Sequence, residues 1–382
     1  MRIGIDYTAA VRQGAGIGRY TRQLVRALAE LDAQNEYVLL TASGGIRKPV
    51  SSLEDVAGRA NVRTVNLPVS DHTMAVLWHR LHLPLWAELS CGALDIFHSP
   101  DFTLPPVRRA RTILTIHDLS FIRVPMTSHP RLRSYLLRAV PASVRRADAV
   151  LADSECTKVD AIELLGADPA CVEVIYPGVE ERFQQVRDTH ALDGVSTHYR
   201  LPARFVLGLA TLQPRKNFER LIEAYARIKA TVGGRLKLVI AGGLGWMYEG
   251  IFQRVEELGL QDAVSFPGYV SDEELPALYT LADVFVFPSL YEGFGLPALE
   301  AMACGTPVVT SNVSSLPEVV GDAALTVDPL DVDALAEAMH RALTDMDLRG
   351  RMIRQGKERA RHFTWPRAAE KLLNVYERTV SS

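Results

Sequence analysis

Short apolar segments without polar alternation, separated by helical patterns, are the feature that most limits how this chain of 382 residues can fold. Such segments are typical of parallel strands that helices cover on both faces of a sheet. The pattern runs through both halves of the chain, so it predicts an α/β protein with two doubly wound, Rossmann-like domains. The strands that we expect read RIGID, EYVLLTA, DIFHSP, RTILTIHDL, DAVLADS, RFVLGLA, LKLVIAGG, AVSFPGY, VFVFPS and TPVVTS.

One polar stretch, about residues 182–204, breaks this rhythm and marks the domain boundary that we expect. We assign residues 1–190 to the first domain and 200–365 to the second, and we expect a final helix at 366–382. Ligands of such sheets bind at the carboxyl ends of the strands. Two sheets that face each other would therefore form one deep cleft.

Composition excludes several classes of protein. A net charge of −3 argues against bulk electrostatic binding to nucleic acid. The four cysteines are widely spaced without a C-x-x-C pair, which disfavours a metal site and fits a reducing cytosol. No charged leader precedes an apolar segment, and no apolar run approaches the ~20 residues of a membrane span. We expect a soluble, cytoplasmic protein.

Residues 100–150 are locally basic, with nine arginines against three aspartates. A cluster of this kind is able to contact an anionic surface, such as the inner face of a membrane. The alternative is an ordinary solvated face of the protein.

Two glutamates, Glu292 and Glu300, lie around the predicted start of a helix in the stretch SLYEGFGLPALEAMACGTPVV. Gly293 and Gly295 allow the backbone to approach a ligand closely, and free N–H groups near Gly295 and Leu296 favour anions. Two carboxylates that accept hydrogen bonds, beside backbone N–H groups that donate them, suit a ligand with many hydroxyl groups and a phosphate. The alternative is that Glu300, expected on the first turn, complements the helix dipole while Glu292 closes a turn.

Three further segments carry candidate groups. Arg215 and Lys216 follow a predicted strand and precede a helix that begins near Asn217 or Phe218. The two cations suit a diphosphate; the alternative is that they are ordinary surface charges.

Gly14, Gly16 and Gly18 join the first strand to a helix that begins near Arg19. The third glycine of a G-x-G-x-x-G motif would be at position 19, which is arginine, so the dinucleotide motif is not met. The loop either binds a phosphate through its N–H groups or forms a tight turn. His117 and Asp118 end a strand of the first half, where a histidine is either structural or functional.

In this order, the segments resemble the retaining glycosyltransferases of family 4, which have the GT-B fold. EGFGLPALEAMACGTPVV fits the E-x(7)-E signature of that family, supported by PRKN, AGGLG, SFPGYVSDEELPALYTLADVFVFPS, HDL and SSLPEVVGDAAL. The resemblance covers nearly the whole chain and implies two Rossmann-like domains that face each other across a cleft. The first would hold the acceptor and the second the nucleotide sugar, and the final helix would cross back onto the first.

The resemblance also implies roles for individual residues. Glu292 faces the donor hexose, Glu300 grips the ribose, Arg215 and Lys216 neutralise the diphosphate, and His117 lies near the hexose. His117, Glu292, Arg215 and Lys216 are thus the expected catalytic residues. The expected donor-binding residues are Gly14, Gly16, Asp118, Tyr269, Val270, Gly293, Phe294, Gly295, Leu296 and Glu300.

Two departures from the family pattern modify this reading. Some relatives carry an arginine five residues before Arg215, where this chain has Ala210, and many have two glycines in place of Ser314 and Ser315. The serine version resembles a subgroup with mannosyltransferases, which favours GDP-mannose as the donor.

We expect transfer of a hexose from a nucleotide diphosphate to a hydroxyl of a glycan or lipid-linked acceptor, with retention and without a metal or other cofactor. Arg131, Arg133, Arg138, Arg145 and Arg146 are expected to meet a lipid-linked diphosphate or an anionic membrane. A nucleotide-sugar epimerase and a non-catalytic nucleotide-sugar-binding protein stay open as alternatives.

Overall fold

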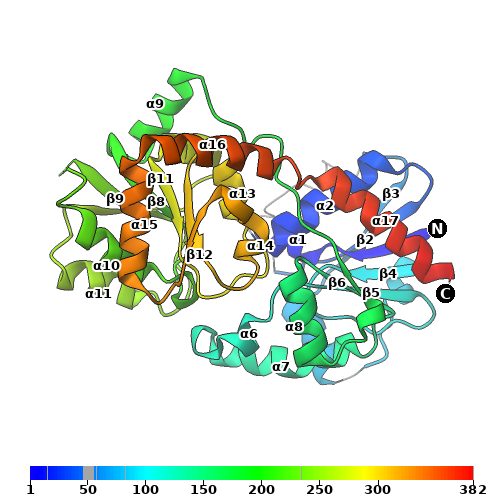
Figure 1. Cartoon of the computed structure of the whole chain (residues 1–382). Coiled ribbons are helices and arrows are strands. Elements are labelled where there is room, and N and C mark those ends of the chain that lie inside the picture. The colour runs from blue at the N-terminus through cyan, green and yellow to red at the C-terminus, as the bar shows by residue number, and fades with distance from the viewer. Residues whose placement is uncertain (15, 46–55, 57, 82, 234, 382) are drawn as a thin grey trace. The chain divides into compact units, whose positions relative to one another are not determined.

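Parallel strands build two separate sheets within the part of the chain that the structure, a computed structural model, describes: residues 1–14, 16–45, 56, 58–81, 83–233 and 235–381. Each sheet belongs to one of two units (Figure 1). The first unit comprises Met1–Ile122, Pro130–Gly178 and Thr364–Ser382, and the second comprises Arg123–His129 and Val179–Phe363. The predicted fold class, with two Rossmann-like parallel sheets, is confirmed.

The first unit contains a seven-stranded parallel sheet in the order β3-β2-β1-β4-β5-β6-β7. Its strands are β1 (Arg2–Asp6), β2 (Glu36–Ala42), β3 (Val62–Leu67), β4 (Ile96–Ser99), β5 (Arg111–Ile116), β6 (Ala149–Ala152) and β7 (Val172–Val174). Its helices are α1 (Thr8–Arg12), α2 (Ile17–Leu31), α4 (Asp71–Ala75), α5 (Glu88–Cys91), α7 (Pro130–Val144), α8 (Glu155–Leu165) and α17 (Trp365–Ser381), and α6 (Ser120–Arg123) lies at its margin.

The second unit contains a six-stranded parallel sheet in the order β10-β9-β8-β11-β12-β13. Its strands are β8 (Arg204–Leu209), β9 (Leu236–Ala241), β10 (Val264–Gly268), β11 (Val284–Phe287), β12 (Val308–Ser311) and β13 (Leu325–Val327). Its helices are α9 (Thr189–His198), α10 (Phe218–Ile228), α11 (Glu249–Glu257), α12 (Leu275–Leu281), α13 (Leu296–Ala303), α14 (Leu316–Val320), α15 (Val332–Thr344) and α16 (Met346–Ala360).

The two sheets share one topology. In each, the chain builds outward from the first strand in one direction and then returns to its other side, so the strand order reverses between β1 and β4 and between β8 and β11. The crevice at such a reversal, outside the carboxyl ends of the strands, is where open α/β sheets bind ligands. In the second unit, therefore, the loops that follow β8 and β11 are the expected binding loops.

The strands that the sequence pattern missed are β3, β7 and β13. In β3 only Val62 is buried and the other residues are exposed or half-buried, and β7 and β13 have three residues each. All three lie at a sheet edge, where only one side pairs and one face remains open, so they lack a continuous apolar run. The pattern detects strands by continuous burial, which these three lack, whereas the edge strand β10 was predicted from the segment AVSFPGY.

The polar stretch 182–204, expected to separate the domains, includes α9 and belongs to the second unit. It packs on the start of α12 through polar bonds. His198 Nδ1 lies 2.8 Å from Glu274 Oε1, and the Tyr199 hydroxyl donates to Glu274 Oε2 at 2.6 Å. The chain first passes from one unit to the other at Arg123, and the long second-unit segment begins after Gly178.

Helix α17 belongs to the first unit, where it contributes to the same apolar core as α2 and β1 (Figure 1). A buried polar chain also ties it to the sheet. The hydroxyl oxygen of Tyr376, on α17, lies 2.8 Å from His98 Nδ1, and His98 Nε2 lies 2.9 Å from Thr115 Oγ1. Burial lowers the pKa of His98 to about 3, so this imidazole is neutral and serves as a structural link between α17, β4 and β5.

Candidate active site

The loop after β8 carries Arg215 and Lys216 on a 3₁₀ turn, Pro214–Lys216, that leads into α10. Asn217 ends this turn in the left-handed region, with φ at 59°, which asparagine tolerates better than most residues. Its buried Nδ2 group donates to Pro288 O at 2.9 Å and to Pro329 O at 2.7 Å. The asparagine therefore fixes the basic turn to the loop that follows β11.

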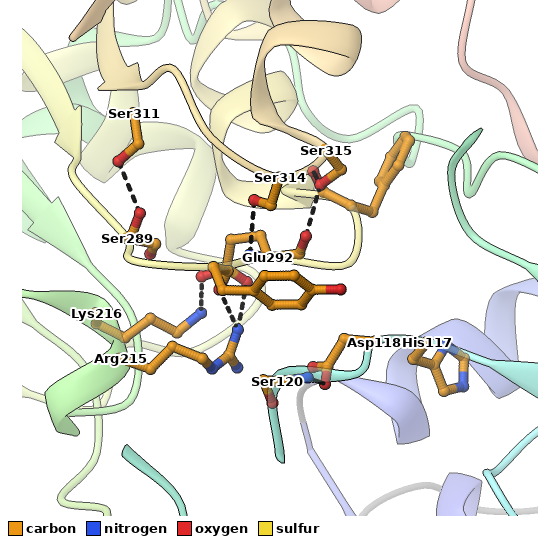
Figure 2. A network of polar contacts seen from close by, with 12 residues as sticks. His117, Asp118, Ser120, Arg215, Lys216, Ser289, Glu292, Ser311, Ser314 and Ser315 are labelled. Atoms are coloured by element: carbon orange, nitrogen blue, oxygen red, sulfur yellow. Dashed lines mark hydrogen bonds and ion pairs between the residues drawn. The ribbon is translucent and has the colours of Figure 1, made fainter. Parts of the chain in front are cut away.

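Both cations of this turn converge on Glu292, which lies in the loop after β11 (Figure 2). Lys216 Nζ lies 2.6 Å from Glu292 Oε1, and Arg215 Nη1 lies 2.9 Å from Glu292 Oε2. Lys216 and Glu292 are only 8% and 7% exposed. Two cations against one carboxylate leave a net positive charge at the strand-order reversal, which favours an anionic ligand.

Glu292 is ionised in this network. Burial alone would raise the pKa of Glu292, but Arg215 and then Lys216 outweigh this effect and hold the pKa below its ordinary value. Lys216 Nζ also lies 5.0 Å from the centre of the Phe287 ring, so the ring face adds a further attraction to the ammonium group.

Two adjacent serines hold the backbone of the Glu292 loop (Figure 2). The Glu292 N–H donates to Ser314 Oγ at 2.9 Å. Ser315 Oγ is buried and lies 2.9 Å from Glu292 O and 2.7 Å from Phe294 O, so its hydroxyl proton is shared between two carbonyl groups. Ser314 has φ at 55°, in the left-handed region that glycine adopts with the least strain. The sequence analysis identified Ser314 and Ser315 as a departure from the family pattern, but it did not predict that they hold the Glu292 backbone.

The loop continues through Gly293 and Phe294, both buried, to Gly295, which precedes α13. Gly295 has φ at 117°, and a Cβ atom there would lie 2.8 Å from Leu316 Cδ2. Glycine is thus required at this turn. Leu296 is the first residue of α13, so its N–H group lies at the amino end of the helix.

The sequence predicted that Glu300 lies on the first turn of the helix, and this prediction is wrong. It is the fifth residue of the helix and therefore lies on the second turn, because α13 begins at Leu296. Its side chain is 2% exposed, and Glu300 Oε2 accepts a hydrogen bond from the Tyr279 hydroxyl at 3.0 Å. The position rules out a role for Glu300 in complementing the first turn.

Tyr269 and Val270 follow β10 at the carboxyl end of its sheet. Tyr269 is 60% exposed, whereas Val270 is 3% exposed. The exposed Tyr269 ring is available to contact a planar nucleobase. The Val270 side chain is instead buried within the protein.

His117 follows β5 in the first unit and lies between groups from both neighbouring strands. Its Nδ1 lies 2.7 Å from Asp153 Oδ2, after β6, and its Nε2 donates to Pro100 O at 2.9 Å, after β4. Burial alone would lower the pKa of His117, but the Asp153 carboxylate outweighs it, so the pKa is raised. The raised pKa favours the imidazolium form of His117, whose ring is held between the Asp153 carboxyl group and Pro100 O.

The Asp118 side chain closes a turn just before α6. Its Oδ1 accepts the N–H of Ser120 at 2.9 Å, at the start of α6 (Figure 2). This bond accounts for one carboxylate oxygen of Asp118 and leaves its expected donor-binding role as a prediction.

The glycine loop ends at Gly16, which has φ at 59°, and α2 begins at Ile17, two residues before the expected start. Arg22 of α2 reaches back to the loop: its Nη2 donates to Gly14 O at 2.6 Å, and its Nη1 donates to Gln13 O at 2.7 Å. The loop carbonyls are thus held by a cation from the following helix turn, which the glycine spacing did not reveal.

The structure therefore brings Arg215, Lys216 and Glu292 together within the second unit, beside the loop from Gly293 to Leu296. Within the first unit it places His117 against Asp153. Sequence reasoning missed Asp153, although a signal was present: Asp153 is a polar residue near the carboxyl end of the predicted strand DAVLADS and directly follows β6. Asn217 and Arg22 were also missed.

Among the residues that the structure describes, no group of three or more histidine, cysteine or acidic side chains has the geometry to hold a metal ion. No helix in the described part of the chain has the length and apolar character that crossing a membrane requires.

Two family models match this chain. Residues 200–359 match "Glycosyl transferases group 1", and residues 14–183 match "Glycosyltransferase Family 4". O-antigen chain mannosyltransferase B of Escherichia coli is 32% identical over 366 residues, which is 95% of this chain and 96% of that protein. The serotype-specific mannosyltransferase WbdA of Escherichia coli is 33% identical over 71% of this chain and 34% of its own length.

Solved structures share the fold. Sucrose-phosphate synthase from Thermosynechococcus elongatus superposes with a TM-score of 0.78 at 24% identity, over 100% of this chain and 99% of that one. Anabaena Alr3699/HepE in complex with UDP and glucose gives a TM-score of 0.73 at 18% identity, over 98% and 99% of the two chains. Both likenesses concern the GT-B fold.

The fold and these matches define a glycosyltransferase that depends on a nucleotide sugar. The chain belongs to the group 1 glycosyltransferases, family 4.

Replacing Ser315 with alanine tests the support of the Glu292 loop. The change leaves two buried carbonyl groups without their shared donor, at a cost of about 1–3 kcal/mol. We expect a lower affinity for the donor and slower transfer while the protein stays folded, measured by steady-state kinetics and circular dichroism. Ser381→Ala, at the exposed end of α17, is the control. Unchanged kinetics in Ser315→Ala would contradict this role.

Replacing Asp153 with asparagine tests the charge of His117. A raised pKa in the folded state means that the imidazolium stabilises the protein fully below its unfolded pKa, about 6.5, and that this contribution is lost as pH rises through the folded value. We expect Asp153→Asn to move the His117 titration to lower pH, observed by NMR of labelled histidine. Asp188→Asn, at the exposed cap of α9, should leave that titration in place. An identical titration in both variants would refute the assignment.

Proposed function

We propose that this protein is a retaining hexosyltransferase that moves mannose from GDP-mannose to a hydroxyl of a glycan or lipid-linked acceptor in polysaccharide biosynthesis. The observation that supports it most is the buried network of Arg215, Lys216 and Glu292 at the strand-order reversal of the second unit. The mannosyltransferase names of the full-length and partial relatives favour mannose.

The difficult step is departure of the nucleoside diphosphate while positive charge develops on the sugar ring. In our proposal, Arg215 and Lys216 stabilise the leaving diphosphate, with N–H groups of the loop at Gly295 and Leu296. The charges of Arg215, Lys216 and Glu292 sum to +1, which favours the leaving diphosphate. This field is the reason that we propose a reaction without a metal.

Retention requires either a nucleophile on the protein or attack from the face that the diphosphate leaves. Glu292 is the carboxylate nearest to the basic pair, but both of its oxygens are bound to cations, which lowers its reactivity as a nucleophile. We therefore propose front-face attack, in which the departing phosphate accepts the proton of the acceptor hydroxyl. Glu292 orients the hexose, and Glu300 binds the ribose hydroxyls.

His117 supplies a fixed positive charge in this proposal, because its raised pKa favours the imidazolium form and both ring nitrogens are bonded within the first unit. It contributes to electrostatic stabilisation near the hexose and does not transfer the acceptor proton. Asp118, Gly14 and Gly16 complete the donor contacts from the same unit, and Tyr269 borders the base.

We also propose that the protein works in the cytoplasm and contacts an anionic membrane at its surface. The support is the basic character of residues 100–150.

Lys216→Ala and Glu292→Ala test the network. Each should raise the barrier to transfer by roughly 2–4 kcal/mol, the scale of one lost charge-stabilising group. Glu292→Gln should slow transfer but preserve nucleotide binding, because it releases both cations from an internal anion. Transfer is measured with radiolabelled GDP-mannose. The control is Lys237→Ala, because Lys237 is an exposed residue of β9. Near-native turnover in Lys216→Ala would contradict the assignment.

A thermal-shift screen against GDP-, UDP- and dTDP-linked sugars tests the donor. We expect the largest stabilisation with GDP-mannose, since a ligand that binds only the folded state raises its melting temperature. NMR of the product should show the anomeric configuration of the donor. An inverted product would exclude the retaining mechanism, and sugar conversion without an acceptor would indicate an epimerase.

A further inference from the structure

A large cavity lies in the first unit between α7 and the segment formed by α4 and the π-helical turn Val76–Arg80. Its volume is about 1130 Å³. Every residue that lines it comes from 72–80 or 131–146, so the cavity is complete within one unit. None of the candidate donor-binding or catalytic residues lines it.

Arginines dominate the charge of this cavity. Its lining contains Arg80, Arg131, Arg138, Arg145 and Arg146 and no acidic residue. Within the described ranges, none of these five side chains forms an ion pair with an acidic group; Arg138 donates to Ser134 O and Arg146 to Leu104 O. Unpaired guanidinium groups around a concave surface are suited to phosphate, which they bind in bidentate fashion.

Arg133 differs from the other arginines of α7. It donates to Phe121 O at 3.0 Å and does not line the cavity, so it supports the local backbone. Of the basic residues that the sequence singled out, the other four reach the cavity, and Arg80 joins them from the opposite wall.

The remaining lining is apolar or aromatic and includes Val76, Trp78, Leu132 and Ala139. Exposed leucines continue this surface. Leu132 is 46% exposed, and the segment after Arg80 contributes Leu81 and Leu85, at 56% and 40%. Trp78 Nε1 donates to Leu85 O at 3.0 Å, which holds this leucine segment against the cavity wall. Adjacent exposed apolar side chains of this kind mark an interaction site.

We infer that this cavity binds a lipid that carries a phosphate or diphosphate group. The arginines hold the phosphate, and the hydrocarbon chain lies along Val76, Leu132 and Ala139. A water-soluble phosphate would not require the apolar wall, and a flat membrane surface would not require the concavity. The inference rests on the proposed function in one respect: it identifies the acceptor as lipid-linked and places its carrier in the first unit.

Farnesyl diphosphate is a suitable probe because it combines both groups in one small molecule. Isothermal titration should show that it binds more tightly than inorganic pyrophosphate, which lacks the chain, and than farnesol, which lacks the charge. If pyrophosphate bound equally well, the apolar wall would have no role and the inference would fail.

Paired variants connect this binding to the cavity. Arg131→Ala/Arg145→Ala should weaken farnesyl diphosphate binding roughly tenfold or more, because two guanidinium groups that face the phosphate are lost. Arg63→Ala/Arg109→Ala removes the same charge from exposed positions outside the cavity and should change little. Leu132→Asn should weaken binding of farnesyl diphosphate but not of pyrophosphate. Equal losses in both arginine pairs would indicate general electrostatics and overturn the inference.

Two further measurements separate the outcomes. Phosphatidylcholine vesicles with and without phosphatidylglycerol report adsorption to a membrane surface; adsorption that depends on Arg131 and Arg145 without farnesyl diphosphate binding would overturn the lipid-phosphate site. Thermal shift by GDP-mannose reports the donor site. A donor shift that persists in the cavity variants, together with absent farnesyl diphosphate binding, rejects this inference alone, whereas an absent donor shift rejects the proposed function.

Discussion

The salt-bridge network of Glu292 with Arg215 and Lys216 is the interaction on which the organisation of the second unit depends. A buried carboxylate is costly unless charged partners and hydrogen bonds compensate it, and here two cations from one loop meet it at 2.6 and 2.9 Å. The two loops are also joined through their backbones, because the Leu290 N–H donates to Arg215 O at 2.8 Å. The network thus couples the ends of β8 and β11 and presents excess positive charge where the strand order reverses.

Each charged group in this network is held by an uncharged neighbour. Asn217 fixes the basic turn through two buried carbonyl groups, and Ser314 and Ser315 fix the backbone on either side of the Glu292 side chain. Such support keeps the charges in place before a ligand arrives, so little reorganisation is needed on binding. The first unit follows the same principle with His117, whose two ring nitrogens are both bonded to neighbouring loops.

The sequence predicted the fold class, most central strands and the basic pair, because these follow from burial and from short-range order. Residues such as Val284–Phe287 are buried on both faces and therefore form an uninterrupted apolar run. The edge strands β3, β7 and β13 were missed because they lack a continuous buried apolar run, whereas the edge strand β10 was predicted. The contacts of Asp153, Ser315 and Asn217 were missed for another reason. Their partners are 36, 23 and 71 residues away, so the position of Asp153 near a strand end suggested a site but did not identify His117 as its partner.

Helix α17 has a consequence for how the protein is made. Its residues Trp365, Leu372 and Tyr376 belong to the core of the unit that also contains the amino terminus. During synthesis, the ribosome must translate the whole of the second unit before these side chains emerge. Until then, the apolar surface of the first unit beside α2 remains uncovered. The main segment of the second unit ends at Phe363, so this unit is able to complete its folding first, although most of it is synthesised later.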